Sequence, residues 1–206
     1  MVFLVWKGGL PMPMTNVRKL ARVLKVLVTI TFVCNLIALV LVPDLVLIQD
    51  VLPLMSDFLP KIQWDIVKFI YIFGCAIVYL PNAWATVWGS EHHYVELTLF
   101  LFFCGVCTAV ILWQARRVLN TILAGVPFQN ANGISLRRAA VCCFLISTAA
   151  LVRLLWGFWY YASIQPLLTY NALFIPVFFM GGLLCLVMSA LFRQAAELKA
   201  ENDLTI

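Results

Sequence analysis

The chain has 206 residues, of which 64% are hydrophobic and only 11% are charged, and its formal net charge is +5. A soluble domain averages roughly 45–50% apolar and about 25% charged residues, so this composition excludes an ordinary water-soluble protein and indicates an integral membrane protein. The basic excess does not predict direct nucleic-acid binding, because its distribution follows the sidedness of a membrane protein.

The first apolar run, residues 23–42, reaches the roughly 20 residues that a helix needs to cross a bilayer. The basic residues that lead into it are Arg18, Lys19, Arg22 and Lys25. Because short segments rich in Lys and Arg stay in the cytoplasm, we expect this helix to start inside. Pro43-Asp44 is expected to end it on the outer side.

The next segment, residues 44–93, is predicted to lie outside. Pro53 and Pro60 are expected to break any long helix in it. Its apolar stretch 65–88 is rich in Trp and Tyr, which favour the membrane interface. If this stretch spanned the bilayer, two basic clusters would fall on opposite sides and one would break the positive-inside rule. We therefore interpret it as an interfacial or re-entrant segment.

A basic loop, residues 116–138, opens with two arginines and closes with two more, Arg137 and Arg138, and is predicted to be cytoplasmic. The preceding helix is expected to continue to about Leu123 and to stop at Gly125, because glycine and then proline terminate helices. Asn132 is the expected N-cap of the next helix.

Further spans are predicted at 94–115, 139–161 and 173–192, followed by a cytoplasmic tail, 193–206. Together these segments predict one all-α integral membrane domain: a polytopic membrane helix bundle of four transmembrane helices with both termini in the cytoplasm. Of the 14 basic residues, eleven fall on the predicted cytoplasmic side, Lys61 and Lys68 fall outside, and Arg153 lies within a span.

Two motifs at the predicted cytoplasmic end carry a family resemblance. In the loop, Pro127-Phe128, Asn132 and Leu136-Arg137 fit the pattern Pro-Phe, three residues, Asn, three residues, Leu-Arg. The tail has Leu191-Phe192-Arg193, Glu197-Leu198-Lys199 and Glu201-Asn202-Asp203-Leu204-Thr205-Ile206. In both motifs the chain resembles the bacterial membrane family catalogued as domain of unknown function 2975.

This resemblance implies four spans with both motifs in the cytoplasm. Genes of that family often lie beside a small Cro-like helix-turn-helix regulator, which implies a role in membrane-linked transcriptional control. The expected partner-binding residues are Pro127, Phe128, Asn132, Leu136, Arg137, Glu201, Asn202, Asp203, Leu204, Thr205 and Ile206. Arg137 and Arg138 are expected to meet Glu201 or Asp203. The alternative is that this pairing only closes the inner end of the bundle.

Arg153 is the most costly residue, because a central arginine costs about 2.5–3.5 kcal/mol to insert into a membrane. It lies ~24 Å along a helix from Arg137, at 1.5 Å per residue, and therefore in the outer half of its span. Glu96 begins the second span at similar depth, so we predict an intramembrane Arg153–Glu96 pair. The alternative is an outer-leaflet anion or lipid-headgroup site.

No pattern in the sequence predicts a catalytic, metal or cofactor site. The two histidines, His92 and His93, are adjacent and point apart on a helix, with no third histidine to complete a metal or haem site. The seven cysteines lie in apolar runs, and the Cys104–Cys107 pair lies inside a span. Phosphate-loop and metalloprotease motifs are missing. We therefore expect no enzymatic activity and no cofactor.

These features favour a regulatory membrane protein of the bacterial inner membrane. It would bind or tether a cytoplasmic helix-turn-helix transcription regulator in response to an envelope signal sensed by residues 44–93. The alternative is a structural accessory subunit of a larger membrane complex, or a homo-oligomer. A third option is a lipid-binding or transport helper centred on Arg153. In every case the lipid bilayer is itself a partner.

Overall fold

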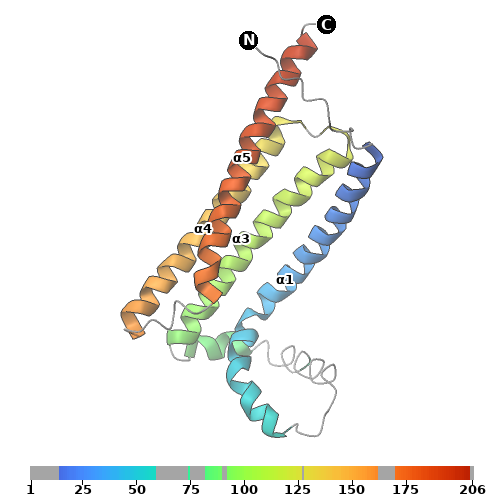
Figure 1. Ribbon diagram of the computed structural model, residues 1–206. Coiled ribbons are helices and arrows are strands. Elements are labelled where there is room, and N and C mark those ends of the chain that lie inside the picture. Colours follow the sequence, from blue (N-terminus) through green and yellow to red (C-terminus); the bar gives the residue numbers. More distant parts are fainter. Residues whose placement is uncertain are drawn as a thin grey trace.

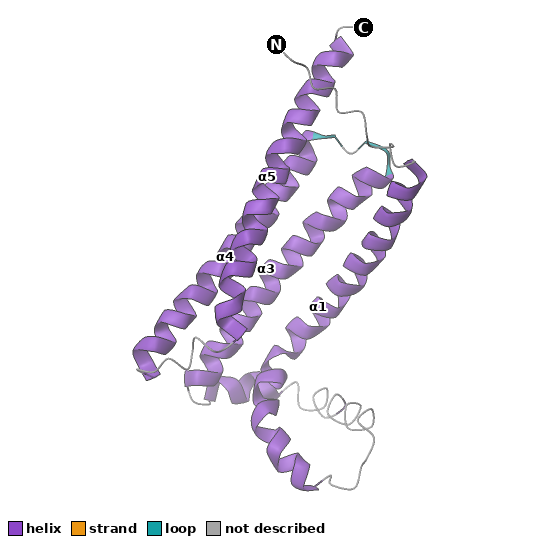
Figure 2. Cartoon of the chain, viewed as in Figure 1, coloured by secondary structure: helices purple, strands orange, loops and turns teal. Residues whose placement is uncertain are grey.

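The structure is a computed structural model that describes residues 14–58, 74, 82–89, 92–126, 128–161 and 170–204. Its long helices are α1 (Met14–Phe58), α3 (His92–Leu123), α4 (Asn130–Tyr161) and α5 (Tyr170–Leu204). A short helical stretch, residues 82–89, lies crosswise at one end of these helices (Figure 1). Within the described ranges there is no strand (Figure 2), so the all-α prediction is confirmed.

Among the described residues, four helical segments are long and apolar enough to cross a membrane: Lys19–Leu47, Tyr94–Leu123, Asn130–Tyr160 and Ala172–Asn202. Each exceeds the ~20 residues that span a hydrocarbon core. A helix satisfies all its backbone hydrogen bonds internally, which is the condition for crossing lipid. The prediction of a multi-pass membrane protein with four spans is therefore confirmed.

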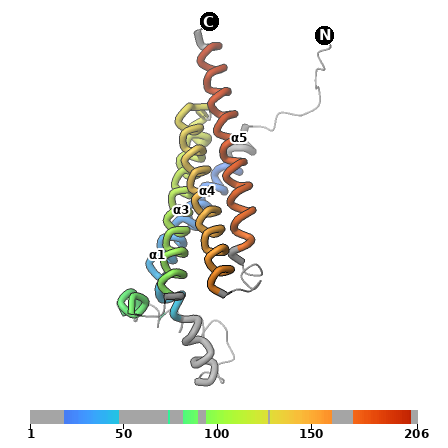
Figure 3. The backbone as a smooth tube through the Cα atoms, turned by 90° about the vertical axis from the view of Figure 1, so that its left-hand side faces the viewer, coloured from blue at the N-terminus to red at the C-terminus, as the bar shows by residue number. Residues whose placement is uncertain are grey.

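The four long helices pack in sequence order, α1 on α3, α3 on α4 and α4 on α5, and no other pair among them is in contact. The side view shows the same arrangement (Figure 3). Of the two inner helices, α4 is the more buried and is the most buried of the four. The outer helices α1 and α5 keep most of their apolar side chains on the surface. This open row leaves one side of α1 and one side of α5 free of the other long helices.

Small residues set the close packing of α4 on α5. Ala140, Ile146 and Ala150 of α4 are fully buried. Ser147 Oγ donates to the Ile175 carbonyl across the interface at 3.0 Å. Small side chains let membrane helices approach until such bonds can form.

Small residues recur every fourth position on α5, at Gly181, Cys185 and Ser189, which predicts that Gly181 faces a neighbouring helix. A methyl group at Gly181 would meet nothing within 4 Å, whereas one at Gly182 would lie 3.0 Å from the Phe144 ring. Gly182 therefore faces α4 in place of Gly181, because one residue turns a helix by about 100°.

The sequence predicts that the first helix ends at Pro43-Asp44, but the structure shows that it does not. α1 continues through Pro43 and Pro53 to Phe58, so the first part of the predicted outer segment 44–93 is a continuation of the first span. Membrane helices tolerate proline because local adjustments and neighbouring groups satisfy the freed carbonyl. The proposed interfacial stretch 65–88 lies outside the described residues except for Gly74 and 82–88.

Helix α3 continues into the predicted basic loop, as expected, and α4 begins at Asn130, two residues before the predicted N-cap Asn132. Only residues 124–129 separate these two helices, so most of the predicted loop 116–138 is helical. α3 does end at Leu123, and Gly125 has a φ of 80°, a conformation that glycine adopts without strain. Gly125 N–H donates to the Ile122 carbonyl and Val126 N–H to the Thr121 carbonyl, both at 3.1 Å. These two bonds make a Schellman motif, as glycine at this position favours.

Candidate functional site

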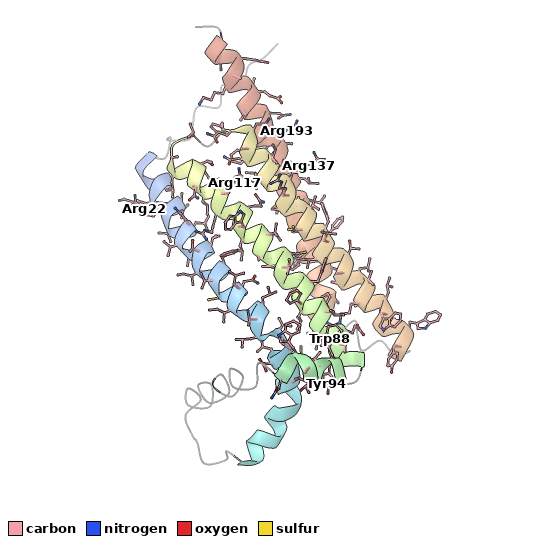
Figure 4. All side chains as sticks on the ribbon, turned by 180° about the vertical axis from the view of Figure 1, so that it is seen from behind. Arg22, Trp88, Tyr94, Arg117, Arg137 and Arg193 are labelled. Carbon is pink, nitrogen blue, oxygen red and sulfur yellow. The ribbon has the colours of Figure 1, made fainter. Side chains whose placement is uncertain are left out.

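Arginines from all four long helices gather at the end of the molecule where α3 gives way to α4. Figure 4 shows Arg22, Arg117, Arg137 and Arg193 at this end and Trp88 and Tyr94 at the other. We call it the basic end. The labelled arginines are all exposed, so they form a positively charged rim on a helix row whose middle is apolar. Both predicted motifs belong to this end.

The beginning of α4 is docked directly on α5 at the basic end. Ser189 Oγ donates to the Gly133 carbonyl at 2.7 Å, and this hydrogen bond is buried. A methyl group on Gly133 would lie 2.6 Å from Arg193 Cγ and 3.1 Å from the Ser189 carbonyl oxygen. The absence of a side chain at Gly133 is therefore what allows the two helices to meet here.

A second buried contact joins the end of α3 to the beginning of α4. Asn132 is 1% exposed, and its Nδ2 donates to Thr121 Oγ1 at 2.7 Å. Thr121 Oγ1 in turn donates to the Val118 carbonyl at 2.7 Å. Asn132 is thus not the N-cap that the sequence predicts, because α4 already begins at Asn130. Its amide bridges two helices, a role that depends on a residue of another helix.

The turn between α3 and α4 also contacts α5 through aromatic rings. The Phe128 and Phe192 ring centroids lie 6.2 Å apart, within the range of a favourable aromatic pair. Phe128 nevertheless remains 50% exposed. Among the other loop residues predicted to bind a partner, Leu136 is half-buried, Arg137 is exposed, and Pro127 lies outside the described residues.

The tail motif continues α5 past the rest of the helix row (Figure 1). α5 ends at Leu204, about 16 Å beyond Arg193 at 1.5 Å per residue. Every residue from 197 to 202, including Glu201 and Asn202, is exposed. Asp203 and Leu204 belong to α5, but their side chains lie outside the described part of the structure, as do Thr205 and Ile206.

The predicted pairing of the loop arginines with the tail has two arms, of which the one to Asp203 lies outside the described side chains. Within the described part of the chain, no ion pair joins Arg137 or Arg138 to Glu201. α5 continues outward from its contact with Gly133, so Glu201 lies about 18 Å along the helix from Ser189 at 1.5 Å per residue. The tail and the loop share one end of the molecule but are held together through Ser189, Phe192 and Arg193.

The predicted intramembrane pair is present at the opposite half of the row. Arg153 Nε lies 3.5 Å from Glu96 Oε1, joining α4 to α3. The guanidinium carbon of Arg153 also lies 4.8 Å from the centroid of the Phe100 ring, a cation–π distance. The negative carboxylate and the ring face together reduce the cost of a cation within an apolar span.

No group of three or more His, Cys, Asp or Glu side chains that could hold a metal ion exists among the described residues. His92 and His93 begin α3, and their side chains are not described. The described cysteines carry free thiols, and Cys107 and Cys143 are buried between helices.

The family match covers the parts of the basic end that α3, α4 and α5 contribute. The family model described as Protein of unknown function (DUF2975) matches residues 76–206, more than half of the chain. The chain belongs to the DUF2975 family. The DUF2975 match includes α3, α4 and α5 with both motifs of the basic end, and it confirms the family predicted from those motifs. α1 lies outside it. Neither a curated protein nor a solved structure matches the chain.

Three residues that organise the basic end in this DUF2975 protein are not among the predicted site residues: Thr121, Gly133 and Ser189. Ser189 carries a sequence signal, because it continues a small-residue spacing on α5. Gly133 and Thr121 carry no comparable sequence signal. Their roles depend on contacts with a neighbouring helix, which the local sequence does not reveal.

Proposed function

We propose that this protein is a regulatory protein of a bacterial inner membrane that tethers a cytoplasmic helix-turn-helix transcription regulator at its basic end. In this proposal the basic end and both termini lie in the cytoplasm. The positive-inside rule supports this orientation, because Arg22, Arg117, Arg137 and Arg193 all lie at that end (Figure 4). The role is one of binding, without catalysis and without a cofactor.

The observation that carries the proposal is the projection of α5 beyond the row. On the proposed cytoplasmic side this helix stands in water, yet Leu198 on it is 61% exposed. Val126 and Phe128 are large apolar residues exposed at the same end. Apolar side chains that gather on a solvated surface favour an interaction site, and a projecting helix suits docking into a groove of a partner.

Charge on the projecting helix supports a DNA-binding partner. Glu197, Lys199 and Glu201 lie beside Leu198 on the exposed part of α5, so its two acids and one base leave a net charge of −1. DNA-binding proteins carry clustered Lys and Arg, so an acidic, apolar-centred helix complements the surface of such a protein. A regulator held there would be kept from DNA, and release would restore its binding.

In this proposal, α1 transmits the envelope signal to the basic end. α1 is one helix from Met14 to Phe58, so it connects the basic end with the beginning of the segment 44–93. It packs on α3, and at Gly105 a methyl group would lie 2.6 Å from Leu39 Cδ1. A displacement of α1 would therefore be transmitted to α3 and to the turn that follows it.

The second candidate is a structural accessory subunit of a larger membrane complex. It is favoured by the open row, in which α1 and α5 each pack on one long helix and keep most of their apolar residues on the surface. Another membrane protein could cover these faces in place of lipid.

Affinity capture of the full-length protein tests the proposal. With a tag at the amino terminus and mild detergent, we expect a helix-turn-helix regulator to co-purify. Leu198→Glu should reduce its yield at least about tenfold, because truncated interface anchors often cost 2 kcal/mol or more. Ala200→Glu is the matched control, since Ala200 is also exposed on α5 and the added charge is the same.

Equal recovery from both variants, or recovery of no DNA-binding protein from the wild type, contradicts the tethering proposal. Recovery of a stoichiometric integral membrane complex, unchanged by Leu198→Glu, favours the accessory-subunit alternative.

A further inference from the structure

We infer that the Arg153–Glu96 pair and the apolar slot beside it bind one zwitterionic aminophospholipid, of the phosphatidylethanolamine class. The headgroup would contact the charged pair, and one acyl chain would fill the slot. This inference does not depend on the proposed regulatory role. It also holds for either orientation of the protein, because the site lies in the leaflet that surrounds the beginning of α3.

The slot is an open pocket of about 450 Å³ between α3 and α4. Apart from the charged pair, its principal lining residues are Phe100, Phe103, Leu145, Ala149, Val152 and Trp156. Along α4 the lining runs from Leu145 to Trp156, about 16 Å at 1.5 Å per residue. Half of a ~30 Å hydrocarbon core is about 15 Å, so the slot has the length of one leaflet.

The charged pair lies near the headgroup end of this slot, about one turn below Trp156 on α4. Glu96 is one turn from the beginning of α3, about 6 Å along the helix from His92. Arg153 is held beside it at 3.5 Å, while Phe103 and Leu145 line the deeper part. A lipid seated with its acyl chain in the slot would therefore place its polar group at Arg153 and Glu96.

The charges of the pair match a headgroup that carries both signs. The Glu96 side chain is 39% exposed and that of Arg153 is 15% exposed, so both reach the surface that faces lipid. A carboxylate exposed to hydrocarbon is costly unless a polar group meets it. The ammonium of an aminophospholipid supplies that group for Glu96, and its phosphate suits the guanidinium fork of Arg153.

The same two charges select against other lipids. A purely anionic headgroup, such as phosphatidylglycerol, could meet Arg153 but would be repelled by Glu96 and brings no cation to the Glu96 carboxylate. The ring of Phe100, 4.8 Å from the guanidinium carbon, holds Arg153 over the slot. The site therefore favours the zwitterion by the placement of Glu96.

Lipid retention tests the inference. The full-length protein is reconstituted into vesicles of equal phosphatidylethanolamine and phosphatidylglycerol, extracted with mild detergent, and its bound lipid is measured by mass spectrometry. We expect the wild type to retain phosphatidylethanolamine with a preference of roughly tenfold, the effect of one charge-assisted contact. Glu96→Gln should abolish that preference, and the double variant Arg153→Gln with Glu96→Gln should lose retention of both lipids.

The slot is tested separately by Ala149→Phe, which fills it without altering the charged pair. Its matched control is Leu151→Phe, on the lipid-facing surface of α4 and outside the lining residues. Loss of retained lipid in the first variant alone supports the inference. Equal retention in the two variants, a preference for phosphatidylglycerol, or no retained lipid in the wild type overturns it. Glu96→Gln preserves side-chain size, so that comparison does not depend on the larger substitution folding.

Discussion

Gly133→Ala is expected to destabilise the protein by about 1–2 kcal/mol, the overpacking cost less the helix-propensity gain of alanine, whereas the same change at Gly181 should be neutral or stabilising. At Gly133 the new methyl group would lie 2.6 Å from Arg193 Cγ and 3.1 Å from the Ser189 carbonyl. Overpacking of this kind typically costs about 1–3 kcal/mol. Moving α5 away would also weaken the buried Ser189–Gly133 hydrogen bond, and such bonds contribute on average ~0.6 kcal/mol in membrane helices.

Gly181 is the matched control because it lies in α5, where a methyl group would meet nothing within 4 Å. Alanine gains up to about 1 kcal/mol of helix propensity over glycine, and that gain applies at Gly181 without any clash. Thermal unfolding of both variants in the same detergent measures the difference. Equal melting temperatures for the two variants would show that α4 and α5 do not meet at Gly133 as described.

Removing residues 197–206 is expected to abolish capture of the regulator while leaving the membrane helices folded. The described side chains of this segment, 197–202, are all exposed, so their removal takes away no described buried contact of the row. The anchoring contacts of α5, Ser189 with Gly133 and Phe192 with Phe128, remain in the shortened chain. We therefore expect a melting temperature close to that of the full-length protein.

The functional effect should be large, because the deletion removes the apolar anchor Leu198 together with the two acidic residues beside it. Co-purified regulator should fall by at least roughly a hundredfold if two or more anchors of about 2 kcal/mol are lost. Transcription from promoters under that regulator should change in the same cells. Unchanged capture with a folded, shortened protein would place the partner surface elsewhere or exclude a tethered partner.

The sequence was a reliable guide where a physical requirement acts within one segment. Each span is recognisable because about 20 apolar residues are needed to cross lipid. Gly125 predicts the end of α3 because few other residues adopt its φ of 80° without strain. The Arg153–Glu96 pair follows from the cost of a buried charge, which needs a partner at the same depth.

Prediction failed where the outcome depends on contacts between segments. Pro43 does not end α1, since a membrane helix continues through proline when its surroundings compensate. Asn132 has the pattern of an N-cap but bonds to Thr121 of another helix. The close approach of Gly133 to Arg193 fixes where α5 packs on α4, and no local pattern predicts it.

The central claim is that the basic end, with the turn between α3 and α4 and the end of α5, faces the cytoplasm. A phosphatase reporter that is active only outside the cytoplasm can be fused after Gln129, after Gln165 and after Ile206. We predict activity at Gln165 alone, with a cytoplasmic fluorescent reporter active at Gln129 and Ile206. Phosphatase activity at Gln129 or at Ile206 would contradict this orientation and the docking surface proposed from it.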